Sequence, residues 1–274
     1  GISSITGLSA FYNLEELRLT GAVSDLSPIS LLTKLRRVGL TDVTASSLEP
    51  LSLAYSLEEF GWFYAQELTG QSLNSIAHLK RLGALSLYGE SDLSVIGSFP
   101  KLRNFTAGQA TLDDVNELAK LEFLENLFLA NFTEEALPDF RLLRGLHRLS
   151  HAHLQQPGSL TSLDGVDAIP SLTRLSLYGN NISRIDGIGS LPNLDFAGIQ
   201  LNQIESVGDA LDTILSSATI DLSGNPLACN EVAKLIDRSD FTFVFNSECV
   251  PDDSDADGVP DAEDAFPNDP AASV

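Results

Sequence analysis

A short apolar pattern that recurs along the chain limits what this sequence can fold into. It is clearest in residues 172–194, which read LTRLSLYGNNISRIDGIGSLPNL. Leu175 and Leu177 are two residues apart, as in a strand whose alternate side chains enter a core. Asn180 stands where the chain turns, and its amide can bond backbone groups that a turn leaves unpaired. Four later apolar residues supply the other wall of the core: Ile182, Ile185, Ile188 and Leu191.

The pattern can be aligned ten times, at intervals of 20 to 26 residues. The first position of each copy falls at Leu14, Leu35, Leu57, Leu82, Leu102, Leu124, Leu146, Leu172 and Leu194, with a degenerate copy at Ser217. The following two core positions are mostly apolar, although the seventh copy places Leu149 and His151 there. Repeats of this length, each a strand and a return segment, stack into a solenoid.

The pattern resembles the leucine-rich repeats of bacterial surface proteins such as internalins, over roughly residues 1–225. This resemblance implies an α/β fold, a leucine-rich-repeat solenoid with a curved parallel sheet on its concave side. Short helices, 3-10 turns and loops are expected on the convex side, with segments 72–79 and 111–121 as candidates for helices. Residues 1–13 match the back half of a repeat, so the chain starts mid-repeat. Either further repeats or a cap precede Gly1, or this half-repeat is itself the cap.

Strand residues between the core positions are expected to form a concave binding face. Aromatic residues and arginine are enriched at interface hot spots. The alternative is that surface aromatics are ordinary strand formers. Trp62 falls on a core position, where we expect packing. The candidate ligand-binding residues are Phe63, Tyr88, Phe128, Arg148, Arg174, Tyr178 and Phe196.

The asparagine that ends the strand is found only in the last copies. Asn180, Asn202 and Asn225 occupy this position late in the chain. The earlier copies have Ala22, Val43, Ala65, Glu90, Ala110, Phe132 and Leu154 there. We therefore expect the earlier turns to satisfy their backbone groups through neighbouring repeats or water.

Composition excludes several classes of partner. The formal net charge of −22 argues against nucleic acid and anionic membranes as partners. No apolar run approaches the roughly 20 residues that a membrane-spanning helix needs, so no membrane insertion is expected. His147, His151 and His153 lie close in sequence but lack acids or cysteines at ligand spacing, so packing is favoured over zinc. No catalytic constellation is evident, and we expect a monomer that is not an enzyme.

Residues 226–250 resemble the C-terminal cap of extracellular leucine-rich-repeat proteins. Asp221 begins the run DLSGNPLACN, which is followed by EVAKLIDRS and FTFVFNSEC. The resemblance implies a helix and a disulfide between Cys229 and Cys249, with two free thiols as the alternative. Phe241, Phe243 and Phe245 alternate and would close the end of the core. A disulfide would indicate an oxidising compartment.

Residues 251–274 begin with PDDSDADGVPDAED and form an acidic tail. Calcium takes six to eight oxygen ligands from a wrapped loop, and alternate acids deliver carboxylates to one centre. Gly258 permits a tight turn. The run resembles a thrombospondin type 3 calcium repeat, and the alternative is a disordered acidic tail. The candidate metal ligands are Asp253, Asp255, Asp257, Val259 (by its carbonyl), Asp261 and Asp264.

These features together predict an extracellular or cell-surface protein, secreted by a Gram-negative bacterium. Its expected function is to bind a protein or glycan through the concave face, with a structural calcium site. The alternative is a structural spacer or a targeting module of a larger secreted or surface protein. Fold alone does not give function, so the sequence leaves this choice open.

Overall fold

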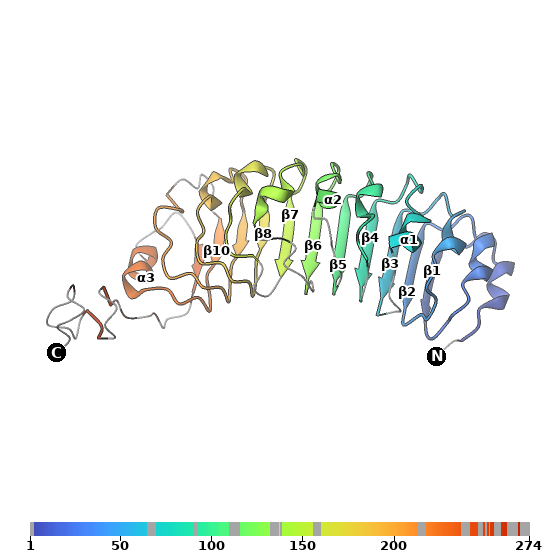
Figure 1. Cartoon of the computed structure of the whole chain (residues 1–274), viewed down its shortest axis with the longest axis horizontal. Helices are drawn as coiled ribbons and strands as arrows, with labels where there is room; N and C mark the ends of the chain where they lie inside the picture. The colour runs from blue at the N-terminus through green and yellow to red at the C-terminus, as the bar shows by residue number, and fades with distance from the viewer. Residues whose placement is uncertain are drawn as a thin grey trace.

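The computed structural model describes residues 3–64, 70–89, 92–109, 116–131, 137, 139–155, 160–212, 218–236, 242–245, 249, 251, 253–254, 259–261 and 268. In these residues, parallel strands follow one another in chain order in one eleven-stranded sheet. Figure 1 shows them side by side along an arched molecule, with β1 and α3 (Cys229–Ile236) at opposite ends. The strands are β1 (Glu16–Thr20), β2 (Arg37–Thr41), β3 (Glu59–Phe63), β4 (Ala84–Tyr88), β5 (Asn104–Gly108), β6 (Asn126–Ala130), β7 (His151–Gln155), β8 (Arg174–Ser176), β9 (Phe196–Gly198), β10 (Thr219–Asp221) and β11 (Thr242–Val244).

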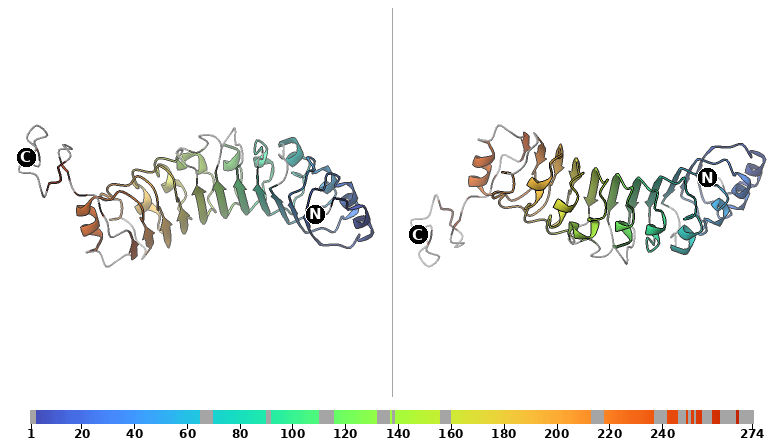
Figure 2. Two further views of the ribbon diagram at one scale, coloured as in Figure 1. Left: turned by 90° about the horizontal axis from the view of Figure 1, so that it is seen from below. Right: turned by 90° about the horizontal axis from the view of Figure 1, so that it is seen from above.

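The return segments carry short helices, and Figure 2 shows the strands as a single continuous row in both views. Two α-helices fall inside or beside the segments predicted to be helical, α1 (Gly70–Asn74) and α2 (Asn116–Ala119). The 3-10 helices are η1 (Thr6–Ala10), η2 (Ser27–Leu31), η3 (Glu49–Leu51), η4 (Ile96–Ser98), η5 (Phe140–Leu143), η6 (Val166–Ala168) and η7 (Ile188–Ser190). The architecture is therefore the predicted solenoid.

The core is a stack of apolar rows between the strands and the return segments. Equivalent residues of successive strands are directly paired, as Leu85 on β4 is with Phe105 on β5 and that residue with Leu127 on β6. All three are buried, and Trp62 is 1% exposed, which confirms its predicted packing role. Because each row is continuous, every repeat buries its apolar face against both neighbours.

A left-handed residue follows the end of most strands. After β1 to β6, its backbone N–H donates to the carbonyl of the last residue of the next strand, as Asp42 does to Phe63 (2.9 Å) and Gln109 to Ala130 (3.1 Å). This pairing is how the early turns, which lack asparagine, satisfy their backbone groups. The residues with positive φ at this position are Gly21, Asp42, Tyr64, Gly89, Gln109, Asn131, Gly179, Leu201 and Gly224.

The three late asparagines add side-chain bonds to the same turns. The amide of Asn202 donates to the carbonyls of Leu177 (2.9 Å), Ile199 (3.1 Å) and Gln200 (3.1 Å). Its carbonyl oxygen accepts from the N–H of Ile182 at 3.0 Å. Asn180 and Asn225 donate in the same way to carbonyls of their own and the preceding repeat. These three residues form a short asparagine ladder, and the prediction that an asparagine at this position bonds the backbone groups of the turn is confirmed for them.

The predicted register of the seventh repeat is wrong by three residues. β7 pairs with β6 so that Ala152 lies opposite Leu127 and Leu154 opposite Leu129. Leu149, rather than Leu146, is therefore the first apolar residue of this repeat. Both leucines satisfy the L-x-x-L spacing, but the observed register buries Ala152 and Leu154 and leaves His151 exposed. Burying an imidazole without a partner would cost free energy that this register avoids.

This shift moves Arg148 off the concave face, contrary to prediction. Arg148 lies just before the strand, at the position that Lys101 and Phe123 hold in the two preceding repeats. Its guanidinium carbon is 4.7 Å from the centre of the Phe123 ring. The ammonium of Lys101 is 4.3 Å from the same centre. Arg148 thus makes a cation–π contact at the edge of the sheet where the strands begin, which we call the strand-entry edge.

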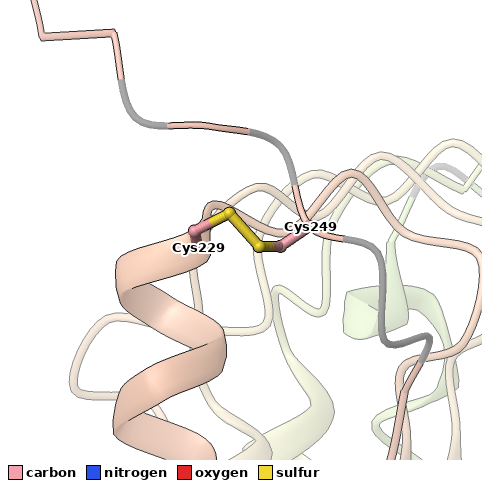
Figure 3. Close-up of a disulfide and its surroundings, with 2 residues drawn as sticks. All are labelled: Cys229 and Cys249. Carbon is pink, nitrogen blue, oxygen red and sulfur yellow. A yellow bond between two sulfur atoms is a disulfide. The ribbon is translucent and has the colours of Figure 1, made fainter. Parts of the chain in front are cut away.

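The C-terminal end of the solenoid is closed by α3 and β11. Cys229 and Cys249 form the predicted disulfide, with Cα atoms 4.9 Å apart, at the first turn of α3 (Figure 3). Phe243 and Phe245 pack against the core cluster. Phe241, the third aromatic predicted to close the core, lies outside the described residues.

Candidate functional site

Two hollows lie over the described residues of the concave face, and ion pairs line the first. This hollow, of about 400 Å³, lies over β1–β4. Within it, the carboxylate of Glu16 contacts Arg37 at 2.7 Å and Arg18 at 3.0 Å. The hydrogen bond and charge of Arg37 lower the pKa of Glu16 below its ordinary value. Glu59 lines the same hollow, so two carboxylates face two guanidiniums there and little unmatched charge is left for a ligand.

Aromatic rings gather where β3 and β4 end. The rings of Phe63 and Tyr88 stack with centroids 5.6 Å apart. The ring of Phe63 folds back over Gly61, where an added Cβ would come within 2.4 Å of it. Tyr64 is 69% exposed at φ 49°, an unusual backbone angle for a bulky residue. These three aromatics form a platform beside the first hollow.

The second hollow, of about 380 Å³, lies over β5–β9. The ring of Phe128 and the imidazole of His153, which are directly paired across β6 and β7, lie parallel within 2°. Their centroids are 4.2 Å apart, which is a close stacking distance. His153 is half-buried, and burial lowers its pKa below the ordinary value. Phe196 lies on the far side of the hollow, with its ring 3.0 Å from where a Cβ on Gly198 would be.

Two nitrogen-bearing side chains line the strand-entry side of the second hollow. Arg174 on β8 is directly paired with His151 on β7, and both are exposed. The Nδ1 atom of His151 is 2.9 Å from the hydroxyl of Ser150. Arg174 forms no ion pair with any carboxylate in the described part of the chain. The guanidinium therefore remains available to a ligand.

The concave face of β4–β9 carries no carboxylate, although the chain has 38 Asp and Glu against 16 Lys and Arg. The first acid beyond this stretch, Asp221 on β10, accepts a hydrogen bond from Gln200 at 2.7 Å. The outward residues are Ala84, Ser86, Tyr88, Asn104, Thr106, Gly108, Asn126, Phe128, Ala130, His151, His153, Gln155, Arg174, Ser176, Phe196 and Gly198. With histidine neutral, the one formal charge among these outward residues is thus the guanidinium of Arg174, within a strongly acidic protein.

The structure places most of the predicted binding residues on this face. Phe63 and Tyr88 lie in the platform, while Phe128, Arg174 and Phe196 line the second hollow. Tyr178 lies just beyond the end of β8 and is 42% exposed. Arg148 lies outside the face, as described above. His151 and His153 were missed as surface residues, although the ordinary spacing from Leu149 to Leu172 could have placed them there.

The described part of the chain holds no group of three His, Cys, Asp or Glu side chains arranged to bind a metal. In the acidic tail, the backbone N–H and hydroxyl of Ser254 donate to the carboxylate of Asp261 at 2.7 and 2.6 Å. These bonds lower the pKa of Asp261. Asp253 and Val259 are also described, whereas Asp255, Asp257 and Asp264 lie outside the described residues. Ser254 and Asp261, seven residues apart in the predicted loop, are therefore in direct contact.

Membrane insertion was not expected from the sequence. In the segments that the structure describes, no helix combines the length and apolar character needed to cross a bilayer.

Comparison with known proteins finds similarity in structure only. The sequence matches no protein-family model and no curated protein. An internalin, InlF of Listeria monocytogenes, superposes with a TM-score of 0.73 and 20% identity, covering 91% of this chain and 73% of the internalin. The Arabidopsis receptor kinase HAESA was solved with the peptide hormone IDA and the co-receptor SERK1. It superposes with a TM-score of 0.62 and 18% identity, covering 79% of this chain and 39% of the HAESA chain.

Mouse RP105, solved as a complex with MD-1, gives a TM-score of 0.59 and 20% identity, covering 89% of this chain and 43% of that chain. This chain thus spans less than half the length of the HAESA and RP105 chains. At these identities the likeness establishes the fold. The chain is a leucine-rich-repeat solenoid whose structural neighbours include internalin-like proteins.

Proposed function

We propose that this protein is an extracellular, non-catalytic binding module that recognises its ligand through the concave face of β3–β9. The second hollow carries this proposal, because it combines stacked rings with an arginine that has no ion-pair partner among the described residues. Its volume of about 380 Å³ is within the range of ligand sites. Aromatic and arginine side chains are also the commonest anchors of binding energy.

Two further observations support the proposal. The disulfide between Cys229 and Cys249 is the kind of bond that persists in oxidising compartments, such as the exterior of the cell. Two structural neighbours, HAESA and RP105, were solved in complexes with other proteins or peptides. A protein or a glycan is the ligand class that we propose, with a single copy of the chain as the binding unit.

We also propose that the acidic tail binds calcium as a structural ion. Asp253, Asp255, Asp257, Asp261 and Asp264, with the carbonyl of Val259, would supply the oxygen ligands. The bonds from Ser254 to Asp261 fit this proposal, because they bring together residues seven apart in the loop. When bound, the cation would neutralise part of the charge of the tail and order it.

The binding proposal can be tested with an array of cell-surface polysaccharides and a pull-down from surface extracts, both in millimolar calcium. The concave variant is Tyr88→Ala, Phe128→Ala, Tyr178→Ala. The control is Tyr12→Ala, Tyr55→Ala, which removes two exposed aromatics that precede the strands. Loss of a captured ligand by the concave variant alone would support the proposal. Equal capture by all three proteins, or no capture by the parent, would favour the alternative that the chain is a structural spacer.

A further inference from the structure

We infer that the second hollow binds an acidic saccharide, with a sugar ring beside His153 and Phe196 and the anionic group on Arg174. This inference rests on the proposed function and names its ligand class. It follows from three features of the hollow: the direction of its open ring face, the absence of carboxylates and the kind of polar groups that line it.

The open ring face is defined by one row of side chains across the sheet. Strand pairing places Thr106, Phe128, His153, Ser176 and Gly198 side by side in that order. Phe128 covers one face of the imidazole, so the other face is directed toward Ser176 and Gly198. Neither of these residues has a large side chain.

A slot therefore lies above Ser176, with the imidazole of His153 on one side and the ring of Phe196 on the other. The strands that carry these two rings are two interstrand spacings apart, about 10 Å. A single flat ring fits between two such walls, and the C–H face of a pyranose can pack against each of them.

Charge then selects among flat ligands. Arg174 and His151 lie next to each other at the strand-entry side of the slot. No Asp or Glu faces outward on β4–β9 to compete for them. A guanidinium binds a carboxylate or sulfate through two parallel hydrogen bonds, whereas a neutral sugar leaves it unmatched. The slot should therefore prefer an acidic sugar over a neutral sugar of the same ring.

The polar lining favours a saccharide over an acidic peptide. Asn104, Asn126 (joined by a 2.6 Å hydrogen bond), Thr106 and Ser176 line the same hollow and can meet ring hydroxyls. A peptide that binds a sheet as an added strand needs free backbone groups at a sheet edge. The backbone of β5–β9 is already paired within the sheet. The hollow offers no such edge.

The test is titration calorimetry of the full chain with four ligands: a uronic acid oligosaccharide, a sulfated one, a neutral one of similar length and an oligoglutamate. The variants are Arg174→Gln and Arg174→Lys. The control is Arg184→Gln, because Arg184 is an exposed arginine paired with Asp186. We expect the parent to bind an acidic oligosaccharide. Arg174→Gln should weaken this binding about 10- to 100-fold, with Arg174→Lys intermediate and the control unchanged.

Thermal unfolding of each variant separates lost binding from lost folding; Arg174 is exposed, so its replacements should melt with the parent. Preference for the neutral chain or the oligoglutamate, or insensitivity to Arg174, would overturn the inference. If no acidic oligosaccharide binds, but the parent captures another ligand that the Tyr88→Ala, Phe128→Ala, Tyr178→Ala variant does not, the inference is wrong and the proposed function stands. If no ligand binds in either experiment, both are wrong.

Discussion

The carboxylate of Glu231 on α3 accepts a hydrogen bond from the backbone N–H of Val207, 24 residues earlier, at 3.1 Å. The ammonium of Lys234 lies 2.5 Å from its other oxygen. Although it is an acid in a strongly acidic chain, Glu231 is only 5% exposed. It joins the closing helix to the preceding repeat by a bond that the sequence did not reveal.

Replacing Glu231 should loosen this end of the solenoid. Glu231→Ala leaves the N–H of Val207 without its acceptor in a buried setting, which costs about 1–3 kcal/mol of unfolding free energy. Urea unfolding followed by circular dichroism measures the change. Glu205→Ala removes an exposed acid nearby and should change the unfolding free energy by less than about 0.5 kcal/mol. Equal effects of the two variants would contradict a specific role for the bond.

Asn202 should be the most sensitive member of the asparagine ladder, because it is 2% exposed and bonds four backbone groups. We expect Asn202→Ala to cost about 2–4 kcal/mol of unfolding free energy, as several buried groups lose their partner. The control is Asn193→Ala, at an exposed asparagine with one bond to a carbonyl. Denaturant midpoints that shift by the same amount in both variants would refute the ladder's contribution.

Stability should fall in mild acid because of His153. Burial lowers the pKa of His153 in the folded protein, so the unfolded chain takes up its proton at a higher pH. The stabilisation from neutral His153 is complete above the unfolded pKa of about 6.5. It is lost progressively as the pH falls from there toward the folded pKa.

His153→Gln should therefore lose less stability between pH 7 and pH 5 than the parent does. Urea midpoints at the two pH values measure the difference. His78→Gln is the comparison, because His78 is exposed and lies away from the hollow. A parent whose midpoint shifts no more than that of His153→Gln would show that burial of this imidazole does not matter.

Calcium should bind once per chain, with a dissociation constant on the order of 0.1–1 mM, typical of extracellular modules. The variant Asp253→Asn, Asp257→Asn removes two predicted ligand carboxylates and should abolish binding. Titration calorimetry with calcium measures this. The variant Asp195→Asn, Asp209→Asn removes the same number of negative charges at exposed positions outside the tail. Equal binding by both variants would indicate diffuse attraction of the cation rather than a site.

The repeating part of the fold could be predicted from the sequence because burial imposes it on every copy. The L-x-x-L-x-L spacing fixes which strand residues enter the core, and it gave the correct register wherever only one alignment fits. In the seventh repeat, Leu146 and Leu149 both fit the pattern. The observed register is the one that buries Ala152 and Leu154, and this burial depends on the pairing of β7 with β6.

The site was less predictable because it depends on neighbours across the sheet. Phe128 could be named from its outward position, but its partner His153 is 25 residues away and follows the ambiguous repeat. The turns were unpredictable for another reason. A left-handed backbone suits glycine, aspartate and asparagine, yet Tyr64 and Leu201 also adopt it because the next repeat accepts their N–H groups.

Those strand-end bonds have a consequence for how the protein can change in length. They join backbone to backbone, from Gly21 to Thr41 and from Leu201 to Ser223, whatever the side chains are. A cut after any of β1 to β6 therefore exposes the same backbone connector. Deleting or duplicating one whole repeat would rejoin matching ends, so the solenoid can become shorter or longer in evolution while the hydrogen bonds between repeats are kept.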